Sequence, residues 1–121
     1  MAKWLKETGK KGEDLAVDYL RRHGYKIIER NFQKGYGEID IVAQEGDTLV
    51  FVEVKTRKSS RFGSPLEAIT PWKIKALIRS CQFYKSLHAE LPESLRLDVV
   101  SVLIFPGGGV ERIELVKNIT G

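Results

Sequence analysis

Charged side chains lie inside two segments of this chain that otherwise have the composition of buried β-strands. The first segment, 37–42, reads Gly-Glu-Ile-Asp-Ile-Val, and the second, 51–55, reads Phe-Val-Glu-Val-Lys. Burying an unpaired charge costs free energy, so charges in such segments usually interact with a metal ion, a partner or a substrate. The residues that could do chemistry here are therefore Glu38, Asp40, Glu53 and Lys55.

Strand periodicity predicts which of these side chains lie together. Side chains alternate between the two faces of a strand, so Glu38 and Asp40 share a face, as do Glu53 and Lys55. Ile39 and Ile41 are expected together on the other face of the first strand. If the link is a two-residue hairpin loop at positions 46–47, Asp40 lies opposite Glu53 and Glu38 opposite Lys55. A loop with an odd number of residues would break this register.

An opposed pair of acids predicts a metal site. Directly opposed residues have Cβ atoms about 5 Å apart. Two carboxylates at that distance repel, unless a cation lies between them or one of them takes up a proton. Oxygen ligands suit Mg²⁺ or Mn²⁺, so Asp40 and Glu53 are the expected metal ligands. The alternative is a plain surface ion pair, because Glu-x-Lys is a common pattern on strands.

Phosphodiester hydrolysis is the chemistry that such a site would support. The metal would polarise the phosphate and lower the pKa of a bound water, with the Val54 carbonyl as a further ligand. Lys55 would orient the water or stabilise charge on the phosphate. Glu38 is near enough to be a further ligand or a partner of Lys55. Glu13 would join from a preceding helix, through water or a second ion, although such a residue taken alone is more often a solvated helix residue.

Basic residues gather downstream of the acids. The net charge is only +4, but the segment 55–79 holds seven basic residues against one acid, Glu67. The seven are Lys55, Arg57, Lys58, Arg61, Lys73, Lys75 and Arg79. A basic segment beside two carboxylates fits a polyanionic substrate such as nucleic acid. The alternative is a solvated helix face followed by a basic loop.

The elements that position these residues follow from hydrophobic periodicity and turn signals. A first helix is expected over 10–23, with Glu13 at the border of its apolar stripe. Thr70 and Pro71 predict the start of a second helix, on which Trp72 is expected to be a packing residue. The remaining segments are strands over 25–32, 37–43, 50–55, 95–105 and 110–116, and a loop over 56–70. The order α-β-β-β-α-β-β predicts an α/β domain with one mixed sheet.

Composition sets limits on the class of protein. A chain of 121 residues with 42% hydrophobic residues is expected to form a single domain over 1–121. No apolar run is long enough to span a membrane, and the N-terminus has no signal-peptide core, so a cytoplasmic protein is expected. Cys81 is the only cysteine, which excludes an intrachain disulfide and a cysteine metal cluster.

Asp40 and the run Glu53-Val54-Lys55, after a helix bearing Glu13, resemble the PD-(D/E)xK nuclease superfamily. A longer string resembles the YraN family of small bacterial proteins, which are similar to archaeal Holliday-junction resolvases. That string includes Gly12-Glu13, Gly37-Glu38-Ile39-Asp40, the segment 51–57 and Arg96-Leu97-Asp98-Val99-Val100. One departure is that Ile39, not proline, precedes Asp40.

The resemblance implies a fold, a site and an activity. The fold is a restriction-endonuclease-like αβββαβ core, here with an extra C-terminal strand and helices flanking the sheet. Asp40 and Glu53 are implied as metal ligands, Lys55 as the catalytic lysine and Glu13 as an auxiliary acid. The expected function is a Mg²⁺- or Mn²⁺-dependent endonuclease acting on DNA, including branched or damaged DNA.

Three readings of function remain open from the sequence. The first is that endonuclease, and the second is a nucleic-acid-binding module with little or no cleavage. The third is a structural or partner-binding protein on a nuclease fold, because fold does not determine function. Junction resolvases act as two-fold dimers, so a homodimer is expected from the resemblance. The last strand and the turn at 107–109 form a candidate edge for that pairing.

Overall fold

A computed structural model of the chain describes residues 3–34, 36–58 and 69–120. Two helices and five strands follow one another in the order expected from the sequence. They are α1 (Lys3–Arg22), β1 (Lys26–Phe32), β2 (Ile39–Glu45), β3 (Thr48–Arg57), α2 (Pro71–Leu87), β4 (Ser94–Ile104) and β5 (Val110–Val116). Neither helix is long and apolar enough to cross a bilayer within the part of the chain that is described.

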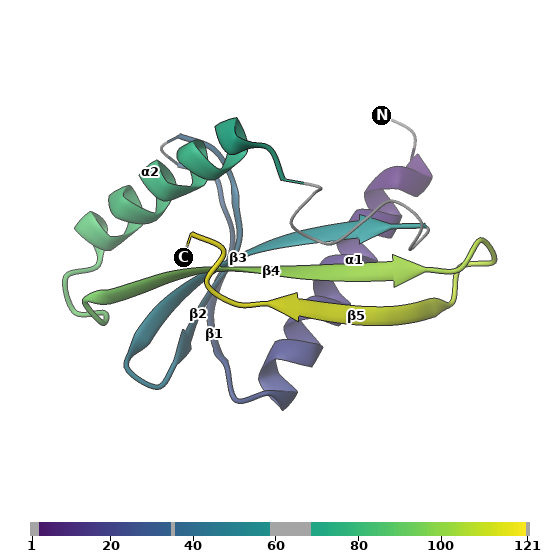
Figure 1. Cartoon of the computed structure of the whole chain (residues 1–121), viewed down its shortest axis with the longest axis horizontal. Coiled ribbons are helices and arrows are strands. Elements are labelled where there is room, and N and C mark those ends of the chain that lie inside the picture. Colours follow the sequence, from purple (N-terminus) through teal and green to yellow (C-terminus); the bar gives the residue numbers. More distant parts are fainter. Residues whose placement is uncertain (1–2, 35, 59–68, 121) are drawn as a thin grey trace.

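All five strands form one sheet in chain order, β1-β2-β3-β4-β5 (Figure 1). β3 and β4 run parallel, and the other neighbouring strands are antiparallel. A parallel pair needs a long crossover connection, and α2 lies in the connection between β3 and β4. The sheet is therefore mixed, and the α/β, restriction-endonuclease-like architecture predicted from the sequence is confirmed.

The helices cover opposite faces of the sheet, so the central strands are buried on both sides. On one face, α1 contributes Leu20 and its neighbours to a core with Ile41 and Val52. On the other face, Tyr84 and the rest of the apolar stripe of α2 pack on Phe51. Strands buried on both faces are apolar at almost every position, which makes charges such as Glu53 conspicuous in β3.

Two element boundaries differ from the sequence predictions. α1 begins at Lys3 rather than at residue 10, because the helix runs through Gly9, a residue type that is unfavourable in a helix interior. β3 continues through Arg57, because pairing with β4 extends to Arg57↔Leu103. The predicted loop therefore cannot begin at residue 56. Most of that loop, including Arg61, lies outside the described residues.

Strand alternation breaks beside Asp40. Ile41 packs in the core under α1, whereas Ile39, expected on the same face, packs under α2. Ile39 pairs with Phe32, which also packs under α2. The residue before Phe32 is Asn31, whose φ of 56° is left-handed, a conformation that asparagine tolerates better than most residues. This irregularity in β1 explains why the expected face of Ile39 was wrong.

Candidate active site

The hairpin register that brings the two acids together is the predicted one. Gly46 takes a φ of 58° at the first central position of the turn, where type II′ hairpins favour glycine. Glu45 pairs with Thr48, and the ladder continues regularly to Ile41↔Val52. The next step in this register sets Asp40 against Glu53.

Asp40 is tied to β3 at that step by a hydrogen bond rather than by regular strand pairing. Its Oδ2 atom accepts a hydrogen bond of 2.8 Å from the backbone N–H of Val54. Val54 directly follows Glu53, so the hydrogen bond fixes the Asp40 carboxylate beside the acidic position of β3. The two acids come from neighbouring strands, and their spacing depends on the short turn that joins those strands.

Glu53 is a buried acid that is only partly compensated. The residue is 3% exposed, and its Oε1 atom lies 3.5 Å from Lys55 Nζ and 3.7 Å from Lys73 Nζ. Its Oε2 atom is buried and has no hydrogen-bond partner among the described residues. A buried carboxylate oxygen without a partner is costly, so it indicates a position that a cation or a ligand would occupy.

Asp40 has a strongly perturbed acidity. The pKa of Asp40 is raised from 3.8 to about 7, first by burial and then by the nearby Glu53 carboxylate. The Val54 N–H opposes the shift by stabilising the carboxylate, whereas Glu38 and Glu13 add to the shift through their negative charge. Perturbed acids of this kind cluster at functional sites, because the same burial and like charge that shift the pKa also favour cation binding.

Glu13 reaches the site from α1 and is held by two donors from β1. Its Oε1 atom accepts hydrogen bonds of 3.0 Å from Arg30 Nε and of 3.0 Å from Asn31 Nδ2. Arg30 also contacts Asp14 at 2.6 Å, so it bridges two acids of the helix. The charge of Glu13 contributes to the pKa of Asp40, which places the helix acid on the periphery of the carboxylate pair.

The basic residues of this segment that the structure describes make contacts with different parts of the protein. Lys55 and Lys73 flank Glu53. Lys75 and Arg79 lie over aromatic rings on the outer face of α2. Arg57 donates to Ser101 Oγ at 3.4 Å. Lys58 ends the described part of the segment as an exposed residue, and Arg61 is outside the described residues.

The acids present fit a magnesium-like ion that keeps much of its own hydration. Asp40 and Glu53 offer two carboxylates, one with an oxygen that has no partner. No group of three or more His, Cys, Asp or Glu side chains with metal-binding geometry occurs among the described residues. Mg²⁺ is usually held by one or two carboxylates, with waters and substrate phosphates as its other ligands. The pair fits that kind of site better than an all-protein cage.

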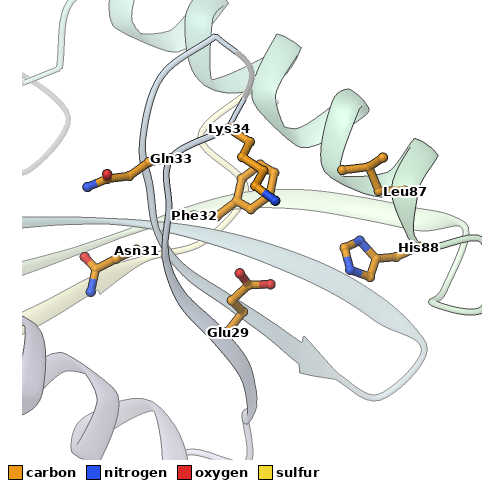
Figure 2. A pocket seen from close by; sticks show the side chains of 7 residues that line it. All are labelled: Glu29, Asn31, Phe32, Gln33, Lys34, Leu87 and His88. Atoms are coloured by element: carbon orange, nitrogen blue, oxygen red, sulfur yellow. The ribbon is translucent and has the colours of Figure 1, made fainter.

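A separate hollow lies between β1 and the end of α2, with a volume of about 500 Å³. Figure 2 shows Glu29 and His88 pointing into it, while Asn31 and Gln33 point away from α2. Glu29 accepts a hydrogen bond of 2.9 Å from the Tyr84 hydroxyl, and His88 Nδ1 lies 2.9 Å from the Tyr84 carbonyl. Glu29 and His88 thus both have partners in the protein, so the carboxylate pair is the stronger candidate for chemistry.

Sequence reasoning missed some contacts of the site and misjudged one aromatic residue. The positions of Arg30 and Asn31 around Glu13 depend on how α1 packs on β1, which spacing does not reveal. The contact of Lys73 with Glu53 likewise depends on the docking of α2. Trp72 was expected in the core, but it is 79% exposed, so that prediction was wrong. The next residue, Lys73, is directed to Glu53, and Trp72 lies on the solvent side of the same helical turn.

Comparison with known proteins gives consistent matches over most of the chain. The model of a family described as "Uncharacterised protein family UPF0102" matches residues 12–102. A UPF0102 protein from Syntrophomonas wolfei is 53% identical over 84% of this chain and 89% of its own length. One from Geobacter metallireducens is 45% identical, covering 93% and 91%. Another, from Caldicellulosiruptor bescii, is 44% identical, covering 94% and 97%.

Proposed function

We propose that this chain, which belongs to the UPF0102 (YraN) family, is a divalent-metal-dependent nuclease that hydrolyses phosphodiester bonds of DNA. One observation carries the proposal: the buried Glu53 carboxylate, which lies near Asp40 and beside two lysines, has an oxygen with no hydrogen-bond partner in the described part of the chain. A charge left in this state inside a sheet weakens the fold, and a function that uses it accounts for its presence.

Asp40 and Glu53 are the residues that would hold the metal. When bound, Mg²⁺ or Mn²⁺ would supply Lewis acidity toward the phosphate and lower the pKa of a bound water. Hydrolysis adds water across a P–O bond, so negative charge builds up on the phosphoryl oxygens in the transition state. Lys55, whose ammonium lies beside Glu53, is the cation that we assign to stabilising this charge.

Glu13 acts as a positioning residue in this scheme. It holds Arg30 and Asn31 through one carboxylate oxygen, and its negative charge acts on Asp40. The negative charge of Glu13 favours binding of a cation at Asp40 without requiring Glu13 to be a direct ligand. Loss of Glu13 should therefore weaken metal binding while leaving residual cleavage at saturating metal.

DNA is the proposed substrate, and branched or damaged DNA the preferred form. The basic residues from Lys55 to Arg79 support a polyanion, and the resemblance to junction resolvases supports DNA with irregular structure. A second candidate function is a nucleic-acid-binding module with little or no cleavage. It is favoured by the two lysines at Glu53, which partly neutralise the acid without any metal.

A cleavage panel tests the proposal and separates it from the alternative. Single-stranded, duplex, flapped and four-way DNA are incubated with the protein in Mg²⁺, in Mn²⁺ and in EDTA. The wild-type protein is compared with Asp40→Asn and with a matched control, Asp18→Asn, which removes an exposed helix acid that pairs with Arg22. Binding of each substrate is measured in parallel by fluorescence anisotropy in EDTA.

The nuclease proposal predicts metal-dependent cleavage of at least one substrate by the wild-type and Asp18→Asn proteins. Asp40→Asn should cut at least 100-fold more slowly while binding with similar affinity. Salt-sensitive binding with no cleavage by any variant would instead support the binding module. Equal cutting by wild-type and Asp40→Asn protein would place the activity elsewhere and overturn the proposed site.

A further inference from the structure

Two of the largest exposed aromatic side chains lie on one surface, away from the carboxylate pair. Trp72 is 79% exposed in the first turn of α2, and Tyr36 is 59% exposed in the turn between β1 and β2. They line a groove of about 550 Å³ together with Lys75, Ala76, Ile78 and Arg79. We call this surface the Tyr36–Trp72 groove.

The aromatic rings of the groove are paired with cations. Lys75 Nζ lies 5.5 Å from the centre of the Trp72 ring, and the Arg79 guanidinium lies 5.6 Å from the centre of the Tyr36 ring. Residues 72, 75, 76 and 79 follow helical spacing, so they share one face of α2. A second hollow, lined by Tyr36, Arg79, Gln82 and Phe83, continues this surface along the helix.

The turn that carries Tyr36 is connected to α2. Ser80 is fully buried, and its hydroxyl donates to the carbonyl of Gly37 at 3.4 Å. This contact joins the residue after Tyr36 to the inner face of the helix. The groove is therefore built from two segments that are held together, rather than from isolated surface residues.

The charge of α2 is entirely positive. The sequence of Pro71–Leu87 contains Lys73, Lys75, Arg79 and Lys85 but no aspartate or glutamate. Lys73, directly after Trp72, points to Glu53 at 3.7 Å. Trp72, which lines the groove, is therefore the neighbour in sequence of a residue that contacts the candidate active site. An anionic ligand in the groove would meet no acid from the helix.

Aromatic faces interleaved with cations suit one class of ligand, an unpaired nucleic-acid strand. Its bases stack on aromatic rings, and its phosphates pair with lysine and arginine. In a duplex the bases already stack on each other, so their faces are not available to Trp72 or Tyr36. A hydrophobic protein partner is less suited, because burying the two rings would also desolvate Lys75 and Arg79 without giving these cations an anionic partner.

We propose that the Tyr36–Trp72 groove binds unpaired nucleotides by stacking, next to the strand position that is cut at Glu53. The inference deepens the proposed function by naming a substrate class, DNA with a single-stranded stretch beside the scissile bond. Only the cleavage of the bound strand depends on the proposed nuclease activity. Stacking in the groove needs neither metal nor cleavage.

Binding of short fluorescent oligothymidylate in EDTA tests the groove directly. The comparison probe is an oligonucleotide with the same backbone but with abasic sites in place of the bases. The variants are Trp72→Ala and Trp72→Phe, with Leu87→Ala as control. Leu87 is an exposed apolar residue at the other end of the same helix, 52% exposed and outside the groove. Circular dichroism verifies that each variant is folded.

Wild-type protein should bind the oligothymidylate more tightly than the abasic probe. Trp72→Ala should weaken oligothymidylate binding about 10-fold and remove this preference, because stacking on one aromatic ring contributes on that order. Trp72→Phe should retain most of the affinity, and Leu87→Ala should match wild type. Equal binding of the two probes by wild type, or equal effects of Trp72→Ala and Leu87→Ala, would overturn the inference.

Two further comparisons separate the possible failures. Trp72-dependent binding of vesicles containing anionic phospholipid, without oligonucleotide binding, would assign the groove to a membrane surface and overturn the proposal. If the groove binds unpaired bases but the wild-type protein cuts nothing, only the nuclease proposal fails. If the protein cuts DNA and Trp72→Ala cuts flapped and single-stranded DNA as fast as wild type, only the groove proposal fails.

Discussion

At the scale of single residues, the negative charges of Asp40 and Glu53 are only partly compensated by the protein. Glu53 is buried, and one of its oxygens has no hydrogen-bond partner among the described residues, while Asp40 accepts one backbone hydrogen bond. Both burial and mutual repulsion raise the pKa of Asp40 to about 7. Near neutral pH, the protein without metal therefore carries a substantial fraction of protonated Asp40.

This pKa makes a prediction about the pH dependence of stability in EDTA. The unfolded chain releases the Asp40 proton near pH 3.8, and the folded protein releases it near pH 7. Between these values the folded state binds more protons, so raising the pH lowers the free energy of unfolding, by roughly 2–4 kcal/mol in total. Asp40→Asn should remove most of this loss and be more stable than wild type at pH 8.

Urea denaturation at a series of pH values between 4 and 8 measures this effect. Asp18→Asn is the matched control, because Asp18 is exposed and its ion pair with Arg22 contributes little. Addition of Mg²⁺ at pH 8 should stabilise wild type more than Asp40→Asn. The same dependence of stability on pH in Asp40→Asn and wild type would show that the pKa of Asp40 is not raised in the folded protein.

The residue types of the site could be predicted because their arrangement is local. A short turn at Gly46 sets the register of the hairpin as far as Ile41↔Val52, one step before the two acids. Lys73 and Asn31 could not be placed in this way. The first depends on how α2 docks on the sheet, and the second on a left-handed residue that interrupts β1. The exposure of Trp72 also follows from docking, which a helical pattern does not specify.

At the scale of elements, the close approach of α1 to β3 holds the Glu13 end of the helix near the site. A Cβ atom at Gly12 would lie 1.9 Å from Thr56 Oγ1, and Glu13 follows directly. A larger residue at position 12 would therefore force the Thr56 side chain or the helix to shift, which favours glycine here even though glycine weakens a helix. Gly9, directly before the predicted start at residue 10, explains why the start of α1 was predicted too late, whereas α2 was recognised from its Thr70 cap.

Gly12→Ala and Gly9→Ala form a matched pair on this helix. Gly12→Ala should lower the free energy of unfolding by about 1–3 kcal/mol, because the helix must move away from β3. Gly9 has no atom within 4 Å of its Cβ position, so Gly9→Ala should be neutral or stabilise by up to about 1 kcal/mol. Chemical denaturation measures both. Equal effects at the two positions would show that helix propensity, and not packing against Thr56, is what matters.

At the scale of the whole molecule, a buried polar network joins segments that are distant in sequence. Asp98 is fully buried and accepts hydrogen bonds from the Tyr25 hydroxyl, the Arg96 guanidinium and the Asn118 backbone. Arg96 also contacts Glu45 at 2.7 Å. The ion pair between Arg96 and Asp98 thus connects the segment after α1, the first hairpin and the C-terminal segment.

Disrupting this network should destabilise the protein without touching the carboxylate pair. Asp98→Asn should lower the free energy of unfolding by about 3 kcal/mol, because it removes the acid from a buried ion pair and leaves Arg96 less compensated. Glu114→Gln is the control, since Glu114 pairs with Arg112 near the surface of β5 and should change stability by less than about 1 kcal/mol. A similar loss in both variants would contradict a bracing role for Asp98.

The fold as a whole was more predictable than its details. Alternating and helical patterns, with clear turns between them, identify two helices and five strands in the right order. They do not specify where β3 ends, because pairing with β4 extends that strand through polar residues. Side-chain networks such as that of Asp98 form only after distant segments have packed, so they appear in the structure rather than in the sequence pattern.

The central claim is that Asp40 and Glu53 hold a divalent cation for hydrolysis. Its most direct test is single-turnover cleavage started by adding excess Mg²⁺ to protein–DNA complexes formed in EDTA. Wild-type and Asp18→Asn proteins should release product only after Mg²⁺ is added, while Glu53→Gln stays bound and releases none. Product formed in EDTA, or product from Glu53→Gln at the wild-type rate, would contradict the claim.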